Sequence, residues 1–155
     1  MADTATGGPE EATADVEVRW HWLKGMYAAN VLISGPIGLG ALLAPALTRG
    51  LLGVPAGDPI NFGVATGAVP LAFAIAGAAG LRAPLRLSPV LGIQVVYKAL
   101  FLLGVAAPLA LTDGIPGYGL PVVAIFAFFA VGNLIAIPVP YLFGRIGDRD
   151  LPTAE

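Results

Sequence analysis

The chain alternates between four long apolar stretches and short polar connections. The apolar stretches cover residues 24–47, 61–81, 88–111 and 119–143. A membrane-spanning helix needs roughly 20 mainly apolar residues, because the hydrocarbon core is about 30 Å thick and a helix rises about 1.5 Å per residue. All four stretches reach that length, and a water-soluble bundle would still need a polar outer face, which they lack. The pattern therefore predicts four transmembrane helices.

The connections between these stretches are rich in residues that favour turns. They contain Pro55, Gly57 and Pro59, then Pro84, and finally Gly114, Pro116 and Gly117. Because the connections are short, consecutive helices are expected to pack as antiparallel neighbours. Ser88 before Pro89 predicts the N-cap and first position of the third helix. The predicted fold class is all-α, an integral membrane four-helix up-down bundle within a transmembrane domain at residues 19–145.

The Lys and Arg residues predict the sidedness of this bundle. One side of the predicted membrane holds Arg19, Lys24, Arg82, Arg86, Arg145 and Arg149, and the other side holds Arg49. Positive residues in short loops favour the cytoplasmic side of a membrane. We therefore expect a multi-pass protein of the cell (plasma) membrane with both termini in the cytoplasm.

Composition narrows the classes of function. Hydrophobic residues make up 57% of the chain and charged residues 12%, against about 25% charged in typical globular proteins. Residues 1–18 contain five acidic residues and no Lys, Arg or aromatic residue, so we expect an acidic disordered tail. Residues 146–155 are expected to form a short C-terminal tail. The net charge of −2 argues against a nucleic-acid partner, and the absence of Cys excludes thiolate catalysis and disulfides.

One charged side chain is predicted to lie deep in the membrane. Lys98 follows Ser88 by ten residues, which places it about 15 Å along the third helix and near the midplane. A lysine at that depth costs roughly 2.5–3.5 kcal/mol on insertion scales. No predicted span contains Asp or Glu, so the chain supplies no carboxylate partner within the membrane.

Four polar residues on other turns and helices are predicted to lie close to Lys98. Counting from the cytoplasmic ends places Asn133 and Ser34 level with Lys98, and Gln94 and Asn30 one layer nearer the cytoplasm. Gln94 shares a helix face with Lys98, as Asn30 does with Ser34. These five residues form the predicted intramembrane polar or ligand-binding cluster. Tyr97 points about 100° away and is expected at its rim.

The residue types leave three interpretations of Lys98 open. In a structural interpretation, Lys98 donates to Asn133, Ser34 or backbone carbonyls, or extends toward the cytoplasmic side. In a second interpretation, Lys98 takes part in proton movement. In a third, it pairs with an anionic or polar ligand, or with the carboxylate of a partner subunit.

The layout resembles the small four-helix DoxX-like membrane proteins between Lys24 and Phe143. The resemblance is carried by Leu51-Leu52-Gly53-Val54-Pro55 after the first span, the arginine-bearing turn, Lys98, and Gly132-Asn133 in the fourth span. In similar sequences an acidic residue is expected where Asn133 stands, so this chain departs from a Lys–carboxylate pair. The resemblance implies association with respiratory or quinone-linked redox complexes.

These observations favour a non-enzymatic accessory subunit, or a bundle that binds a small ligand, lipid or quinone. The alternative is a small oligomeric transporter or channel, since four helices alone rarely enclose a wide path. The sequence shows no catalytic residues, no metal site and no evident resident cofactor, although a bound quinone or lipid fits the predicted interior. The expected partners are the lipid bilayer and either further copies of the chain or a membrane complex.

Overall fold

The structure, a computed structural model, describes residues 18–139. Both predicted tails, apart from Val18, lie outside the described residues, as do Arg145 and Arg149. Four helices in the described part are long and apolar enough to cross a membrane: Trp20–Leu43, Pro59–Arg82, Ser88–Leu111 and Gly119–Ala136. The prediction of an all-α chain with four such helices is confirmed.

Each of the first three long helices contains a π-helical segment. The first helix comprises α1 (Trp20–Ala29), η1 (Asn30–Ser34) and α2 (Gly35–Leu43), and the short α3 (Pro45–Leu52) follows it. The second comprises α4 (Pro59–Phe62), η2 (Gly63–Ala68) and α5 (Val69–Arg82). The third comprises α6 (Ser88–Phe101), η3 (Leu102–Ala106) and α7 (Ala107–Leu111). The fourth is α8 (Gly119–Ala136), with regular α-helical hydrogen bonding.

Proline explains where the π-helical segments occur. Pro36, Pro70 and Pro108 lie at the second position after η1, η2 and η3 respectively. A proline inside a helix lacks the N–H donor, and its ring clashes with the carbonyl four residues before it. A wider π turn relieves that clash and lets the helix continue. These three prolines therefore widen the helices without ending them.

Two other prolines mark helix ends. Ala44, before Pro45, has φ −140° and ψ 61° and ends the first long helix. Ile137, before Pro138, is extended, with φ −70° and ψ 124°, and ends α8. A residue before proline avoids the helical region, so both ends have a local cause. The fourth helix therefore ends at Ala136, before the predicted end at residue 143. Residues 140–143 of the predicted range lie outside the described residues.

The start of the third helix differs from its prediction. Its N-cap is Leu87, with no side-chain cap hydrogen bond, and Ser88 is already its first residue. The Ser88 hydroxyl instead donates to the Leu85 carbonyl at 2.8 Å. The predicted cap at Ser88 is therefore wrong, because its hydroxyl serves the preceding turn.

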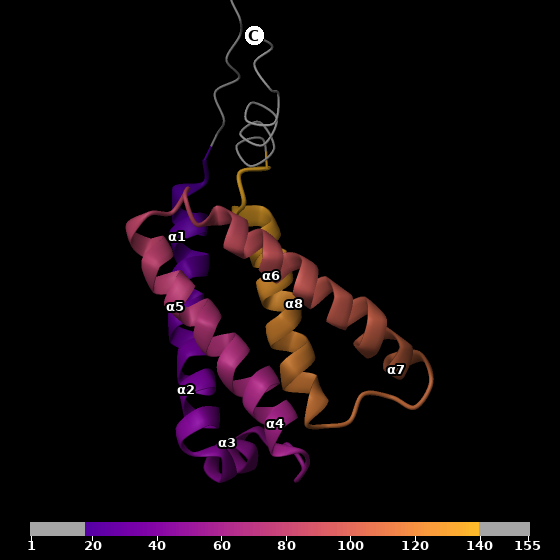
Figure 1. The fold of residues 1–155 in the computed structure, drawn as a ribbon. Helices are drawn as coiled ribbons and strands as arrows, with labels where there is room; N and C mark the ends of the chain where they lie inside the picture. The colour runs from indigo at the N-terminus through magenta and orange to yellow at the C-terminus, as the bar shows by residue number, and fades with distance from the viewer. Residues whose placement is uncertain (1–17, 140–155) are drawn as a thin grey trace, which may run out of the picture.

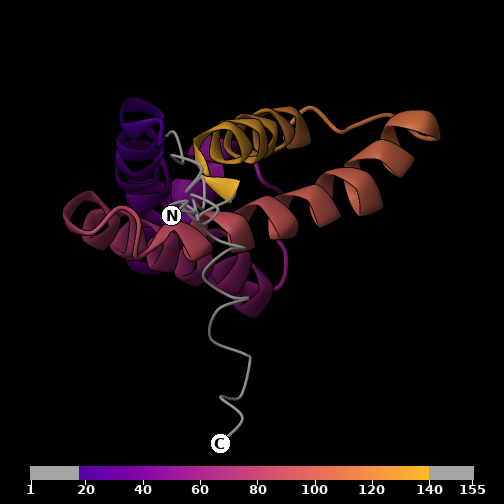
Figure 2. The ribbon, with the colours of Figure 1, turned by 90° about the horizontal axis from the view of Figure 1, so that it is seen from above.

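The first helix packs against the second and fourth, and the fourth packs against the third. The second and third helices meet at their short turn and then diverge, with few contacts between α5 and α6 (Figure 1). Seen from above, the α7 end of the third helix stands apart from the other helices (Figure 2). The expectation that all consecutive helices are close neighbours is therefore wrong for this pair.

Glycines bring the first and second helices into contact. A Cβ atom at Gly38 would lie 2.6 Å from the backbone nitrogen of Leu71 and 2.8 Å from the carbonyl oxygen of Gly67. A Cβ at Gly77 would lie 2.9 Å from the Tyr27 carbonyl oxygen. Close backbone approach at small residues is the usual mode of helix packing in lipid. We call this contact the closed seam.

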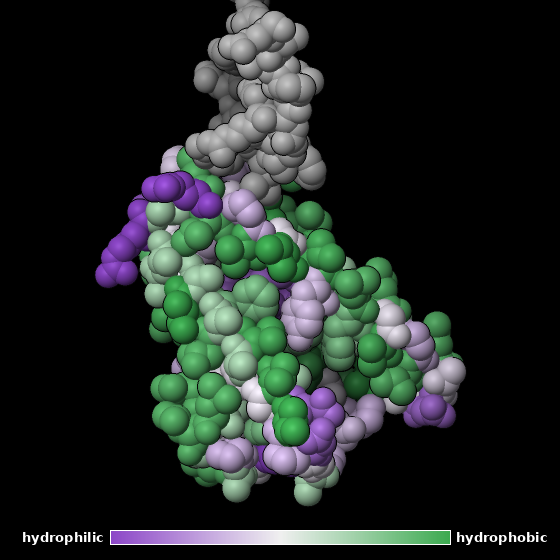
Figure 3. Space-filling view, viewed as in Figure 1, coloured by the Kyte–Doolittle hydropathy of each residue, from purple (hydrophilic) through white to green (hydrophobic). Residues whose placement is uncertain are grey.

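The outer surface of the helices is largely apolar, as an integral membrane protein requires. The space-filling view shows apolar residues over most of one face and polar residues mainly toward its two ends (Figure 3). A cluster of buried apolar residues lies at the end of the bundle that carries the α5–α6 turn. It consists of Leu23, Met26, Tyr27, Leu91, Phe129 and Ala136.

Candidate functional site

A chain of amide hydrogen bonds ties three helices together inside the bundle. Asn30 lies in η1, Gln94 in α6 and Asn133 in α8, and each is at most 1% exposed. The Asn133 side-chain amide donates to Gln94 Oε1 at 2.7 Å. The Gln94 amide donates to Asn30 Oδ1 at 2.6 Å. The Asn30 amide donates to the Met26 carbonyl at 2.9 Å, which completes the chain.

The chain of amide hydrogen bonds leaves one acceptor, Asn133 Oδ1, without a partner within residues 18–139. Asn133 Oδ1 is, among the described residues, the one fully buried side-chain nitrogen or oxygen atom without a hydrogen-bond partner. Interhelical hydrogen bonds in membranes contribute about 0.6 kcal/mol on average, whereas an unsatisfied buried group costs about 1–3 kcal/mol. The amide chain therefore fixes the relative rotation of three helices more than it adds net stability.

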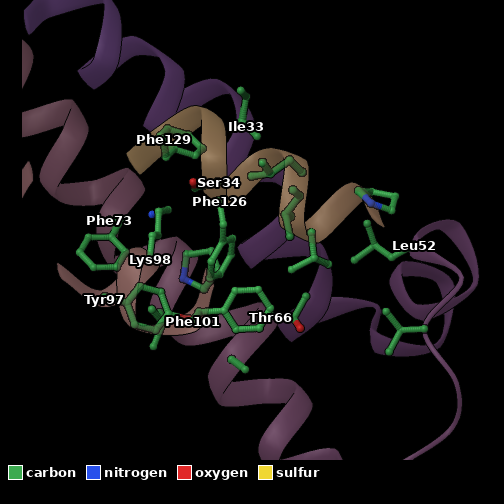
Figure 4. A pocket seen from close by; sticks show the side chains of 18 of the residues that line it. Ile33, Ser34, Leu52, Thr66, Phe73, Tyr97, Lys98, Phe101, Phe126 and Phe129 are labelled. Carbon is green, nitrogen blue, oxygen red and sulfur yellow. The ribbon is translucent and has the colours of Figure 1, made fainter. Parts of the chain in front are cut away.

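Lys98 lies one helical turn beyond Gln94 and is 4% exposed. Its Nζ makes no hydrogen bond or ion pair within residues 18–139, so the hydrogen bonds that the structural interpretation offered, to Asn133, Ser34 or a backbone carbonyl, are not formed there. Aromatic rings surround it instead (Figure 4). The distances from Nζ to the ring centroids are 4.8 Å for Phe129, 5.2 Å for Phe73, 5.5 Å for Phe126 and 5.8 Å for Tyr97.

The rings offset part of the cost of placing this cation in the membrane. Rings within about 6 Å attract a cation, with roughly 0.5–1 kcal/mol at exposed sites and about 2 kcal/mol when desolvated. A lysine near the bilayer centre costs roughly 2.5–3.5 kcal/mol. Aromatic rings also carry no net charge, so they leave the positive charge of Lys98 uncompensated.

A cavity of about 260 Å³ adjoins Lys98 and reaches all four long helices. Its wall is mostly apolar and aromatic, with Ser34 and Thr66 as the hydroxyl-bearing residues beside two tyrosines. Phe73 on α5 faces Tyr97 on α6 across the diverging second and third helices, with ring centroids 6.3 Å apart. Tyr97 in turn packs against Phe126 of α8 at 5.6 Å. We call this cavity the Lys98 pocket.

The structure divides the five predicted cluster residues into two groups. Asn30, Gln94 and Asn133 form the amide chain, so Asn133 joins the layer of Gln94 and not that of Lys98. Lys98 and Ser34 line the Lys98 pocket. Tyr97, expected at the rim, lines the pocket as well.

The aromatic residues around Lys98 are the part of the site that the polar pattern did not reveal. Phe126 and Phe129 precede Asn133 by seven and four residues, so all three share one face of α8. That spacing was a usable signal, because a helix face that turns Asn133 inward also turns both rings inward; Phe129 is buried and Phe126 partly buried. Phe73 offered no comparable signal, since its partners lie on other helices.

The described part of the chain shows no candidate metal site. Residues 18–139 contain no group of three or more His, Asp or Glu side chains that could hold a metal ion. His21 is exposed at the start of α1, beside Trp20 and Trp22. Comparisons with models of protein families, with curated proteins and with solved structures found no match to this chain.

Proposed function

We propose that this chain is a non-enzymatic, multi-pass protein of the plasma membrane that binds a small lipophilic ligand in the Lys98 pocket. The observation that carries the proposal is a buried ammonium group without a hydrogen-bond or ion-pair partner among the described residues, at the wall of an apolar cavity. Ligand sites are typically apolar cavities with few convergent polar groups. Charged residues inside membrane spans commonly mark functional sites.

Lipids and quinones are the ligand classes that fit this proposal. Both reach a membrane-embedded cavity from the bilayer, and both join an apolar body to polar oxygen atoms. We also propose that the chain belongs to the DoxX-like group, on the resemblance that includes Lys98 in the third helix. That group would imply the same quinone-linked setting. The chain itself would then act as an accessory subunit of a membrane complex.

The exposed surface of the third helix supports the proposal that the chain binds a partner protein or further copies of itself. Among the described elements, α7 has substantial contacts only with the adjoining η3, and Leu103 and Leu111 are strongly exposed. Such a surface suits lipid, a second copy or another subunit. An oligomer would also be required by the alternative function, a small transporter or channel. Flux of solutes through vesicles containing the purified chain would favour that alternative.

Copurification tests the proposed ligand-binding function. The wild-type protein, extracted in mild detergent, is expected to carry a small apolar molecule that native mass spectrometry detects. Thr66→Phe fills the Lys98 pocket from η2 and should remove that molecule. Ala72→Phe adds the same ring on the exposed side of α5 and should keep it. Equal amounts of bound molecule in both variants would contradict the proposal.

The proposed orientation, with both termini in the cytoplasm, has a direct test because the chain contains no Cys. Gly117→Cys places a thiol in the connection before α8, and Ala83→Cys places one in the α5–α6 turn. A membrane-impermeant maleimide added to intact cells should label Gly117→Cys and spare Ala83→Cys. The opposite pattern of labelling would reverse the proposed orientation.

A further inference from the structure

The charge of Lys98 has no counterion among the described residues. The carboxylates within residues 18–139 are Asp58 and Asp113, and both lie in connections between helices. Asp58 already accepts hydrogen bonds from the Ile60 N–H at 2.8 Å and from the Asn61 amide at 2.8 Å. Asp113 is exposed beside Thr112. A ligand that neutralises Lys98 therefore has to bring its own negative charge.

Ser34 supplies a second donor at the same cavity. Its side chain is 8% exposed and lines the Lys98 pocket, and its hydroxyl has no hydrogen-bond partner within the described residues. Figure 4 shows the Ser34 oxygen and the Lys98 nitrogen at the same end of the pocket. An ammonium and a hydroxyl can together bind a group with two acceptor oxygens, and a carboxylate is the simplest such group.

The depth of the pocket separates two sources of negative charge in a membrane. Lys98 lies ten residues into the third helix, about 15 Å from Ser88 and thus near the bilayer midplane. The phosphate of a bilayer phospholipid stays at the interface and does not reach that depth. A lipophilic acid with one carboxyl group can reach that depth in its uncharged, protonated form, because its body matches the apolar and aromatic wall, and it loses that proton to water when the carboxylate pairs with Lys98.

We propose that the Lys98 pocket binds a lipophilic monocarboxylate, whose carboxylate accepts from Lys98 Nζ and Ser34 Oγ while its apolar body occupies the cavity. This inference rests on the proposed ligand-binding function and narrows it to one chemical class. A neutral lipid would fill the cavity and leave the charge of Lys98 uncompensated. The negative charge is therefore the feature by which the Lys98 pocket selects its ligand.

Equilibrium binding of decanoate and decan-1-ol separates charge from hydrophobicity. The full chain is placed in nanodiscs of zwitterionic phosphatidylcholine, and uptake by empty nanodiscs is subtracted. Decanoate should bind the wild type at least about tenfold more tightly than decan-1-ol, as a charge-assisted hydrogen bond predicts. Adding anionic phosphatidylglycerol to the nanodiscs should leave decanoate binding unchanged.

Three variants locate the binding. Lys98→Met should abolish the preference for decanoate, Lys98→Arg should retain it, and Ser34→Ala should weaken decanoate binding by roughly twofold to tenfold. Circular dichroism and elution position identify folded variants. If Lys98→Met does not fold, the comparison of Lys98→Arg with the pocket-filling Thr66→Phe replaces it, and Thr66→Phe should lose binding of both probes.

The outcomes separate this inference from the proposed function. Equal binding of both probes to the wild type, with both lost in Thr66→Phe, would overturn the carboxylate inference and leave the ligand pocket intact. If phosphatidylglycerol competes with decanoate, Lys98 binds phospholipid, and this result would also overturn the carboxylate inference. No decanoate binding above empty nanodiscs would overturn it regardless of any copurified molecule.

Discussion

The second helix has two neighbours in the chain, and its contacts with them differ completely. Toward the first helix it presents Gly67 and Gly77, and the two backbones touch at the closed seam. Toward the third helix it presents Phe73, which meets Tyr97 across the Lys98 pocket. The same apolar solvent surrounds both contacts. Small residues thus accompany close contact of the backbones on one side of the second helix, and bulky rings accompany the cavity on the other.

The largest expected effect comes from opening the closed seam. Gly38→Ala places a Cβ atom against the backbone of Leu71 and Gly67, where no side chain can move aside. We expect a loss of about 3 kcal/mol or more of unfolding free energy, the upper range for overpacked interiors. Reversible unfolding in mixed micelles measures it.

Gly92→Ala is the matched control for that substitution. A Cβ at Gly92 has no neighbour within 4 Å, so stability should stay unchanged or rise by up to about 1 kcal/mol through helix propensity. Equal losses in both variants would show that backbone contact does not hold the closed seam together.

The next largest effect comes from breaking the amide chain. Gln94→Leu leaves Asn30 Oδ1 and the Asn133 amide without their partners, and we expect a loss of about 2 kcal/mol. A triple variant with Leu at 30, 94 and 133 has no orphaned side chains and should recover much of that loss. If the triple variant is less stable than Gln94→Leu, the amide chain contributes more net stability than we infer.

Lys98→Met should act in the opposite direction on stability. It removes a cation that costs roughly 2.5–3.5 kcal/mol at mid-membrane, together with cation–π attraction of about 2 kcal/mol, so a gain of about 1 kcal/mol is expected. Lys24→Met, on an exposed part of α1, should leave stability nearly unchanged. A loss for Lys98→Met as large as that for Gly38→Ala would assign Lys98 a structural role.

The smallest effect concerns a single ring beside Lys98. Phe126→Leu removes a ring 5.5 Å from Nζ and should weaken binding of a carboxylate probe only fewfold, because three other rings remain. Phe128→Leu alters an exposed ring of the same helix that meets Phe129 edge-on at 5.3 Å but does not itself face Lys98, so it should have the smaller effect. Equal effects of the two substitutions on binding would show that the Phe126 ring does not contribute to the site.

The four helices and the burial of the five polar residues were predictable for the same physical reason. Apolar runs of membrane length leave few alternatives, and Asn, Gln and Lys at mid-depth seek the interior. The hydrogen-bond pattern was less accessible, because it depends on the rotation of three helices at once. Asn133 was expected level with Lys98, yet it bonds to Gln94. The expectation counted ten helical residues back from Phe143, whereas α8 ends at Ala136 and Ile137 is extended.

The Lys98 pocket itself could not be predicted from the sequence. Its existence depends on the divergence of α5 from α6, whereas the short α5–α6 turn suggested close neighbours. Rings contributed by three helices, Phe73, Tyr97 and Phe126, pack together where these helices diverge, and no single periodicity records their contacts.

The central claim is that Lys98 faces a ligand cavity and not a partner within the chain. The protein contains two lysines, Lys24 and Lys98, so labelling lysine Nζ with ¹⁵N yields two signals, and Lys24→Arg assigns them. Solid-state NMR with decanoate labelled at its carboxyl carbon then measures the proximity of that carbon to each nitrogen. We predict dipolar contact with Lys98 that Thr66→Phe removes. Contact between Lys98 Nζ and the side-chain carbonyl carbon of Asn133, with none to decanoate, would contradict it.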